Sequence, residues 1–469
     1  MAIQQVTDFR QGLKEAIDKA DKITLPVLFS HVEAISNTGP LELYKLSEKL
    51  YKGERFYWKN PEKDLIFTGM GIAHRMQSST DGKRRFQTLQ QKWDTITANT
   101  IIKGILHQAG TGPIAFGGFS FNDRDIQPNT LWDQFGTYLF YIPKFLITQT
   151  PEALFLTSTI LIEKDMSAKI LESFVTEREH IRNLRGNGIS EIPEIISYQE
   201  QSVYEWKQSI QKSVEDIHNH EMDKIVLARQ LDLTFASELS SNGVLENLLC
   251  MQNDSFVFSL ESGDNNFVGA SPERLVKRIG NQVFSSCIAG SIARGENEQK
   301  DKELGSELLN DDKNLIEHQF VVNMIRKAME EQCSRVDIPS CPQLMKLKNI
   351  QHLYTPVEGT SLPGTSILDF VERLHPTPAL GGSPRNVAME KIPEYESFDR
   401  GLYAAPIGWI DMNGDGDFAV GIRSALLKKT QASLFAGCGI VAKSDPESEY
   451  QETSVKFKPM LTAFGGIKK

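Results

Sequence analysis

The sequence predicts an α+β fold in which large antiparallel or mixed sheets are covered by helices. Two pairs of β-rich runs enclose short turn segments at residues 263–266 and 280–281, so neighbouring strands are expected to pair locally. A third hairpin is expected around a glycine-rich turn at residues 411–417. Helical patterns lie between these strand clusters instead of following every strand, which favours an α+β fold over a strict βαβ repeat.

The helices are predicted from apolar spacing. Residues 204–220 carry Trp206, Ile210, Val214 and Ile217 at three- and four-residue steps, which is typical of an amphipathic helix. A single long helix is expected at about residues 301–331 and a last one at about 447–464. The main strands outside the hairpins are expected at residues 112–121, 224–235 and 434–441.

A polar region at residues 176–201 is the best candidate for a connecting loop. It divides the chain into an N-terminal half, residues 1–200, and a second region, residues 201–466. No internal repeat or low-complexity tract is present.

The bulk composition is that of a globular cytoplasmic protein. Lys and Arg number 51 and Asp and Glu 61, a net charge of −10, which argues against nucleic acid or an anionic membrane as the main partner. The N-terminus has no apolar signal segment, and no apolar stretch is long enough to span a bilayer. The five cysteines form no CxxC pair, so each is expected to be a small buried apolar side chain.

Three familiar patterns fail on inspection. The segment 411–417 begins like a calcium loop, but the twelfth position is Ile422 where a bidentate acid is needed. Gly69 and Gly71 are followed by His74 where a dinucleotide-binding loop needs its third glycine. The basic trio at residues 83–85 is expected to be a solvated face.

Two helices carry candidate metal ligands. Glu449, Glu452 and Lys456 share one face of the last helix, and on spacing alone an ordinary surface salt bridge is the better reading. The glycine-rich strand end just before this helix makes a pocket-facing pair of carboxylates plausible. Asn314 and Glu317 lie with Asn310 on one polar stripe of the long helix. Glutamates from separate helices would suit Mg²⁺.

Two further side chains are candidate acid and base. Lys224 shares a strand face with apolar residues, so it is either a snorkelling surface lysine or a desolvated base. Glu273 follows Pro272 at a strand corner, where a turn salt bridge is the alternative. A rigid loop at residues 375–384, with three prolines and two glycines, is expected either to line a site or to form a structural turn.

Nine separated motifs together resemble one family. Read in series, DKIVLAR, GASPERL, CIAGS, NLIEH, HPTPALGG, YAAPIGWI, VGIRSA, FAGCGIV and SEYQETSVK are similar to those of the chorismate-utilising enzymes, over about residues 204–464. The N-terminal half more loosely resembles that of menaquinone-specific isochorismate synthases. The resemblance implies two sheet-and-helix halves around a central β-sandwich. Cys287, Ser291 and Cys438 replace commoner family residues of similar size.

The resemblance implies a magnesium-dependent isomerase that converts chorismate to isochorismate, as a first step of menaquinone synthesis. Lys224 and Glu273 would be the catalytic base and acid. Glu317, Glu452 and Glu449 would serve the metal. The substrate-binding residues implied are Gly290, Ser291, His375, Ala379, Leu380, Tyr403, Arg423, Gly437 and Lys456.

Three positions imply that water is the nucleophile and that no amidotransferase partner is needed. Lys224 matches the lysine of water-using members, Ala289 stands where aminodeoxychorismate synthases carry a nucleophilic lysine, and Asn314 stands where anthranilate synthases usually carry glutamate. The alternatives are a salicylate synthase, a siderophore-pathway isochorismate synthase and, less favoured, an anthranilate synthase or a silent chorismate-binding subunit.

Overall fold

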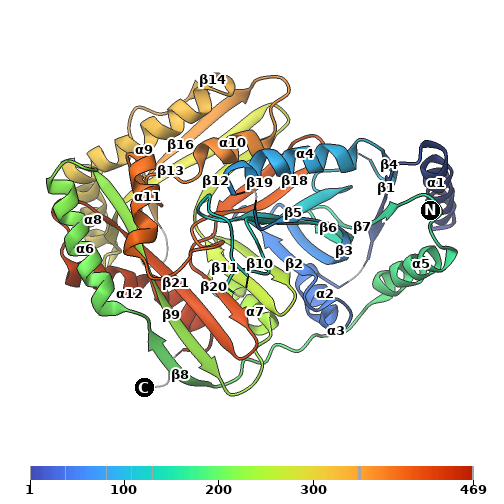
Figure 1. Cartoon of the computed structure of the whole chain (residues 1–469), viewed down its shortest axis with the longest axis horizontal. Coiled ribbons are helices and arrows are strands. Elements are labelled where there is room, and N and C mark those ends of the chain that lie inside the picture. The colour runs from blue at the N-terminus through green and yellow to red at the C-terminus, as the bar shows by residue number, and fades with distance from the viewer. Residues whose placement is uncertain are drawn as a thin grey trace.

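The computed structural model describes residues 2–36, 38–80, 82–106, 108–128, 130–346 and 350–466, with side chains from residue 8 onward. Its strands form one continuous hydrogen-bonded network of 21 strands, flanked by helices (Figure 1). Among the described residues, β1 with β4 is the one parallel pairing, and all other pairings are antiparallel. The predicted α+β class with large antiparallel or mixed sheets is confirmed.

In the first 200 residues, groups of strands are separated by helices. The elements are α1 (Ala2–Ile23), β1 (Val27–Ile35), α2 (Pro40–Leu46), α3 (Glu48–Tyr51), β2 (Arg55–Lys59), β3 (Ile66–Ser78), η1 (Gly82–Arg84), α4 (Arg85–Thr97), β4 (Thr100–Gly104), β5 (Ile114–Phe119), β6 (Tyr138–Gln149), β7 (Leu154–Ile162), α5 (Ala168–Asn183) and β8 (Ile195–Glu200).

The remaining elements carry the family motifs. They are α6 (Val203–His218), β9 (Lys224–Phe235), α7 (Ser241–Met251), β10 (Phe256–Ser262), β11 (Asn265–Ser271), β12 (Arg274–Ile279), β13 (Gln282–Ala293), α8 (Glu298–Leu309), α9 (Asp312–Glu330), β14 (Cys333–Asp337), β15 (Gln343–Lys346), β16 (Ile350–Ser361), α10 (Ile367–Leu374), β17 (Gly382–Ser383), α11 (Arg385–Tyr395), β18 (Pro406–Asp411), β19 (Gly416–Val420), β20 (Ser424–Lys428), β21 (Gln431–Ile440) and α12 (Pro446–Ala463).

Strands from the two predicted regions pair directly with each other. In β10, Val257 lies opposite Lys59 of β2, and in β18, Gly408 lies opposite Gly117 of β5. The sheet network therefore runs across residue 200, and the division into residues 1–200 and 201–466 stays a prediction about sequence regions.

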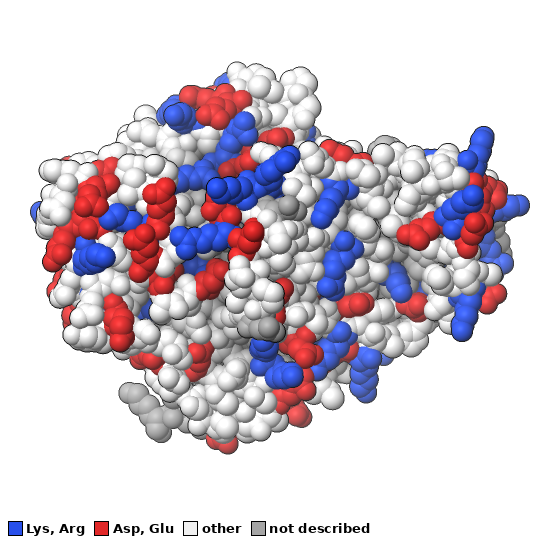
Figure 2. Space-filling model, in the orientation of Figure 1, with Lys and Arg blue, Asp and Glu red and all other residues white. Residues whose placement is uncertain are grey.

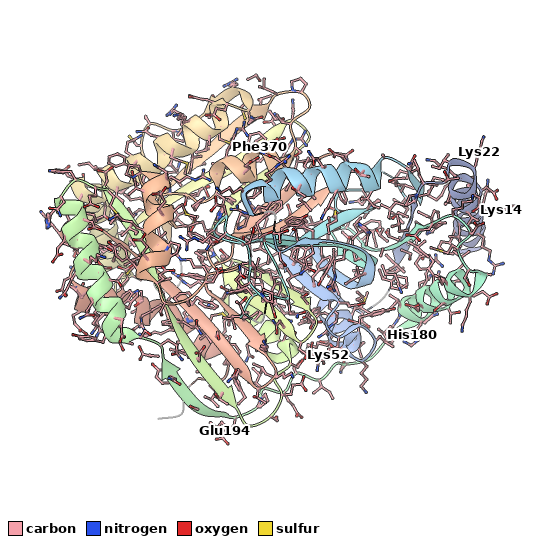
Figure 3. All side chains as sticks on the ribbon, viewed as in Figure 1. Lys14, Lys22, Lys52, His180, Glu194 and Phe370 are labelled. Carbon is pink, nitrogen blue, oxygen red and sulfur yellow. The ribbon has the colours of Figure 1, made fainter. Side chains whose placement is uncertain are left out.

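Aromatic side chains dominate the interior between the sheet layers. The rings of Phe56 and Phe116 stack with centroids 4.4 Å apart, and Trp58 contacts Phe116 edge-on at 5.6 Å. Phe370 of α10 is fully buried against the same core, and side chains fill the space between the ribbons (Figure 3). Because each buried large apolar side chain contributes about 1.5–3 kcal/mol, this core holds the two halves together.

Two predicted segments are wrong in detail. The single helix expected at 301–331 is two helices, α8 and α9, because Asp311 caps the second one, its carboxylate accepting from the backbone N–H of Asn314 at 2.8 Å. Asn310 ends α8 and does not share the stripe of Glu317. The loop expected at 176–201 is shorter, since α5 continues to Asn183 and β8 begins at Ile195.

The predicted hairpins are confirmed. β10 pairs with β11, β12 with β13, and β18 with β19. At the tip of the last hairpin the Asp411 carboxylate accepts from the backbone N–H groups of Asn413 and Asp415 at 2.8 and 2.9 Å, which makes this segment a side-chain-stabilised turn. Within the described residues, no helix has the length and apolar character that crossing a bilayer requires.

Candidate active site

The predicted base lies at the start of β9, where it meets a glutamate from α9. The Lys224 side chain is only 11% exposed, and its Nζ lies 2.5 Å from Oε1 of Glu317. The neighbouring strand β21 leaves room for it: a Cβ on Gly439 would stand 2.8 Å from Cε of Lys224. Of the two alternatives that the sequence left open for Lys224, the structure has the inward-pointing side chain.

A second ion pair lies on α12 beside the same glycine-rich strand. Lys456 Nζ is 2.6 Å from Oε1 of Glu452 and donates to the carbonyl of Gly437 at 2.8 Å. A Cβ on Gly437 would lie 3.2 Å from the hydroxyl of Tyr403. Because Gly437 and Gly439 have no side chains, β21 leaves space for Tyr403 and Lys224 and also leaves its own backbone accessible.

The predicted acid, Glu273, lies in the turn between β11 and β12. Its backbone N–H donates to Oγ of Ser271 at 3.2 Å, which fixes the turn. The residue keeps partial exposure, but its carboxyl is enclosed by protein, and this burial raises its pKa to about 7 against the opposing influence of Arg423, Lys456 and Lys224. These three cations must therefore lie within electrostatic reach of one carboxyl.

Arg423 supplies a guanidinium without a fixed partner. It lies between β19 and β20, and burial lowers its pKa, while Tyr403, Glu273 and Glu452 oppose that shift. Within the part of the chain that the structure describes, no hydrogen bond or ion pair involves its side chain. An enclosed guanidinium of this kind is suited to a carboxylate brought by a ligand, which it can bind bidentately. Burial also raises the pKa of the Tyr403 hydroxyl.

A histidine that the sequence analysis did not single out belongs to the same group. His352 on β16 lies opposite Ser291 on β13, and Oγ of Ser291 is 2.6 Å from its Nδ1. Burial, together with Arg423 and Lys456, lowers the pKa of His352 to about 4, so the ring is neutral. Gly290 next to it has φ +81°, where the register of β13 shifts.

We call seven of these side chains the charged cluster, because electrostatic contacts or ion pairs join each to another member. They are Lys224, Glu273, Glu317, His352, Arg423, Glu452 and Lys456.

Two buried cysteines border the charged cluster. Burial, reinforced by Glu273, raises the pKa of Cys287, and burial with Glu449 raises the pKa of Cys438. Both side chains are neutral thiols. They and Cys333 are buried as predicted, whereas Cys250 and Cys341 are exposed, so the prediction is wrong for those two.

The predicted metal ligands are only partly assembled. Oε2 of Glu449 is buried without a hydrogen-bond partner, and burial raises the pKa of this carboxyl, with a further rise from Glu452. Glu317 and Glu452 are instead paired with lysines. Over the described ranges, no group of three or more His, Cys, Asp or Glu side chains is arranged to hold a metal ion. Glu449 and Glu452 fit a cation, and the full set stays a prediction.

The proline-rich loop at residues 375–384 is held by hydrogen bonds to other parts of the chain. His375 is 1% exposed and its Nε2 donates to the carbonyl of Phe121 at 2.8 Å, while the carbonyl of Leu380 accepts from Arg400 at 2.9 Å. Ala379 between them is partly buried. The structure gives none of these three a hydrogen bond or ion pair with the charged cluster among the described residues, so their role in shaping a ring pocket stays a prediction.

The loop is nevertheless connected to the catalytic strand. The backbone N–H of Val226 donates to the carbonyl of Gly381 at 2.9 Å, and Gly382 and Ser383 pair with Ile225 and Lys224.

The sequence profile of the family described as chorismate binding enzymes matches residues 13–465. The chain therefore belongs to the chorismate-binding enzyme family, as its motifs predict.

Known members of this family resemble the chain over nearly their whole length. Isochorismate synthase MenF of Bacillus subtilis (strain 168) is 42% identical over 465 residues, 98% of each chain. The salicylate biosynthesis isochorismate synthase of Pseudomonas aeruginosa is 32% identical over 98% of this chain and 95% of its own. The solved structure of MenF, the menaquinone-specific isochorismate synthase from Escherichia coli, superposes with a TM-score of 0.77 at 24% identity, over 97% of this chain and all of that one, and so confirms the fold.

Proposed function

We propose that this enzyme is an isochorismate synthase, an isomerase that adds water at C2 of chorismate and removes the C4 hydroxyl. One observation carries the proposal: a carboxyl with a pKa of about 7 and a buried amine belong to one cluster that also holds an unpaired guanidinium. An acid, a base and an anion-binding group are what this isomerisation needs.

The substrate carries two carboxylates, and the charged cluster has cations for them. Arg423 and Tyr403 are assigned to the enolpyruvyl carboxylate, with the backbone at Gly437. Lys456 and Ser291, with the backbone at Gly290, are assigned to the remaining carboxylate contacts. The support for these roles is the unpaired state of Arg423 among described residues and the position of Lys456 on the Gly437 carbonyl.

Proton transfers at two atoms complete the reaction. Lys224 takes a proton from the water that attacks C2. Glu273 gives its proton to the departing C4 oxygen, which leaves as water while the ring double bonds shift. One water enters and one leaves, so the product is an isomer. Each such transfer contributes about 10²–10⁴-fold to the rate.

Glu317, Glu449 and Glu452 would hold Mg²⁺, whose charge would neutralise the ring carboxylate of the substrate. The support is the buried, unpartnered Oε2 of Glu449 and its electrostatic contact with Glu452. Hard carboxylate oxygens are the ligands that this ion prefers.

We infer that the product feeds menaquinone synthesis. The chain is 42% identical to MenF of Bacillus subtilis over 98% of its length, whereas the isochorismate synthase DhbC of the same organism aligns over 56% of the chain at 36% identity. At the same 98% coverage the salicylate biosynthesis isochorismate synthase is only 32% identical, so the full-length identity favours the first relationship.

The decisive experiment is product analysis. The purified protein is stripped of metal with a chelator and incubated with chorismate, with and without added Mg²⁺, and the products are identified by chromatography and mass spectrometry. Isochorismate that accumulates only with Mg²⁺ supports the proposal. Salicylate with equimolar pyruvate would assign a salicylate synthase instead, and a product that requires ammonia would assign an anthranilate synthase.

A further inference from the structure

The basic trio at residues 83–85 is not the solvated face that its sequence predicts. Lys83 and Arg84 are exposed, but Arg85 at the start of α4 is 5% exposed. Its Nη1 donates to the carbonyl of Gly82 at 2.6 Å, while its Nε is buried and has no acceptor. Within the described ranges, no carboxylate forms an ion pair with it.

A buried guanidinium without a counter-ion is costly, because an unpaired charge loses its hydration. Burial lowers the pKa of Arg85 to about 10, and Arg385 adds to this effect. Asp123 and Glu372 lie near enough to oppose the shift, yet neither approaches within ion-pair distance.

A second guanidinium comes from the other half of the chain. Arg385, the exposed first residue of α11, donates to the carbonyls of Arg373 and His375. It too lacks a carboxylate partner among the described residues. Arg400, the third arginine around His375, differs, because Glu396 neutralises it at 2.5 Å.

The helix that begins at Arg85 adds to the positive potential. α4 has 13 residues, no side chain caps its N-terminus, and its first turn contains no acidic residue. The 3-10 helix η1 runs directly into α4, and the Asp125 carboxylate accepts from the N–H of Gly82 at its start at 3.4 Å, so α4 offers an anion its helix dipole. Figure 2 shows basic and acidic side chains interspersed over the face shown, so a site here must be local.

We propose that Arg85 and Arg385, with the N-terminus of α4, form a binding site for a small oxyanion, a phosphate or carboxylate group, outside the charged cluster. The buried, unpartnered Nε of Arg85 marks where counter-charge is missing, and the exposed Arg385 is the part of the site that solvent reaches. Guanidinium groups bind both kinds of oxyanion bidentately. The bound group would supply the counter-charge that the protein does not.

The site is connected to the catalytic strand through a short path. Arg385 holds the carbonyl of His375, and the same loop continues to Gly381 and Gly382, which hydrogen-bond to Val226 and pair with Ile225. Lys224 is the next residue along that strand. A bound anion would therefore stabilise the loop on which the position of the catalytic amine depends.

The test is a titration of the full chain with sodium phosphate, at ionic strength held constant with sodium chloride and without chorismate. Binding is followed by calorimetry and by the thermal midpoint. We expect saturable binding, at least about tenfold weaker in Arg85→Gln and in Arg385→Gln, because each substitution removes a charge-assisted hydrogen bond to the anion; tenfold corresponds to about 1.4 kcal/mol. A parallel titration with acetate shows which oxyanion the site prefers.

Two matched variants serve as controls. Lys83→Gln removes a charge from the same trio, and Arg423→Gln removes the guanidinium of the charged cluster; both should bind phosphate as the parent protein does. The proposal is overturned if no saturable binding occurs, if Lys83→Gln weakens binding as much as Arg85→Gln, or if Arg423→Gln abolishes it. Since Arg385 is exposed, its variant tests the site even if Arg85→Gln fails to fold.

Discussion

Replacing Glu273 by Gln keeps the size of the side chain but removes the proton that the C4 oxygen needs. The carboxyl has a pKa of about 7 because burial disfavours its ionised form, and three nearby cations only partly restore it. About half of the molecules carry the proton at pH 7, and about one in a hundred at pH 9. We therefore expect the ratio of kcat/KM between the parent enzyme and Glu273→Gln to fall about tenfold per pH unit above 7, because only the parent loses its general acid there.

The substitution itself should lower kcat by about 10²–10⁴-fold, the range for a general acid. It also changes stability in a predictable direction. The folded pKa is raised from 4.5 to about 7, so between these values the unfolded chain releases the proton that the native state retains, and stability falls as the pH rises. At 1.36 kcal/mol per pKa unit, the full loss is at most about 3 kcal/mol, and Glu273→Gln should lack it.

Two measurements examine this reasoning. Initial rates of isochorismate formation between pH 6 and 9 give the profile, and urea unfolding at pH 5 and pH 8 gives the stability difference. The control is Asp411→Asn, which alters another buried carboxyl, with a pKa raised to about 6, in the β18–β19 turn. A flat profile, or a Glu273→Gln enzyme within threefold of the parent activity, would refute the role of Glu273.

Three other perturbations have defined outcomes. Lys224→Ala should lower kcat about 10²–10⁴-fold with unchanged circular dichroism, and near-full activity would remove its role as base. Gly439→Ala places a Cβ 2.8 Å from Cε of Lys224, so kcat should fall about tenfold or more while the fold persists; an unaltered kcat would show that the lysine tolerates displacement. The Arg55 guanidinium lies 2.6 Å from the buried carboxylate of Glu261. Arg55→Met leaves that carboxylate without its cation, so the free energy of unfolding in urea should fall by about 3–5 kcal/mol; a loss below about 1 kcal/mol would contradict this.

The sequence was informative where the chemistry follows local periodicity. Helical spacing placed Glu449, Glu452 and Lys456 on one face, and strand alternation turned Lys224 inward; the structure has both arrangements. The hairpins followed from their turn residues for the same reason, because a turn is decided by a few neighbouring residues.

Features that depend on distant contacts could not be predicted in this way. His352 is an ordinary histidine in a strand until the register brings Ser291, 61 positions away, beside it. The burial of Arg85 depends on a loop and a helix from the other half of the chain, which local charge patterns do not reveal. The break between α8 and α9 was accessible in principle, because Asp311 is a residue type that commonly caps helices.

The pairing of β10 with β2 and of β18 with β5 has a consequence for how the molecule can be divided. A fragment comprising residues 201–466 would retain every member of the charged cluster, yet it would expose three strand edges, at Val257 of β10, Gly408 of β18 and Leu233 of β9, which have lost their partners. Unpaired edge strands pair with strands of other chains, so such a fragment should self-associate unless another polypeptide covers these edges. The first 200 residues thus cover the strand edges of the region that carries the charged cluster. Removing them would lower the solubility of the fragment before it altered any member of that cluster.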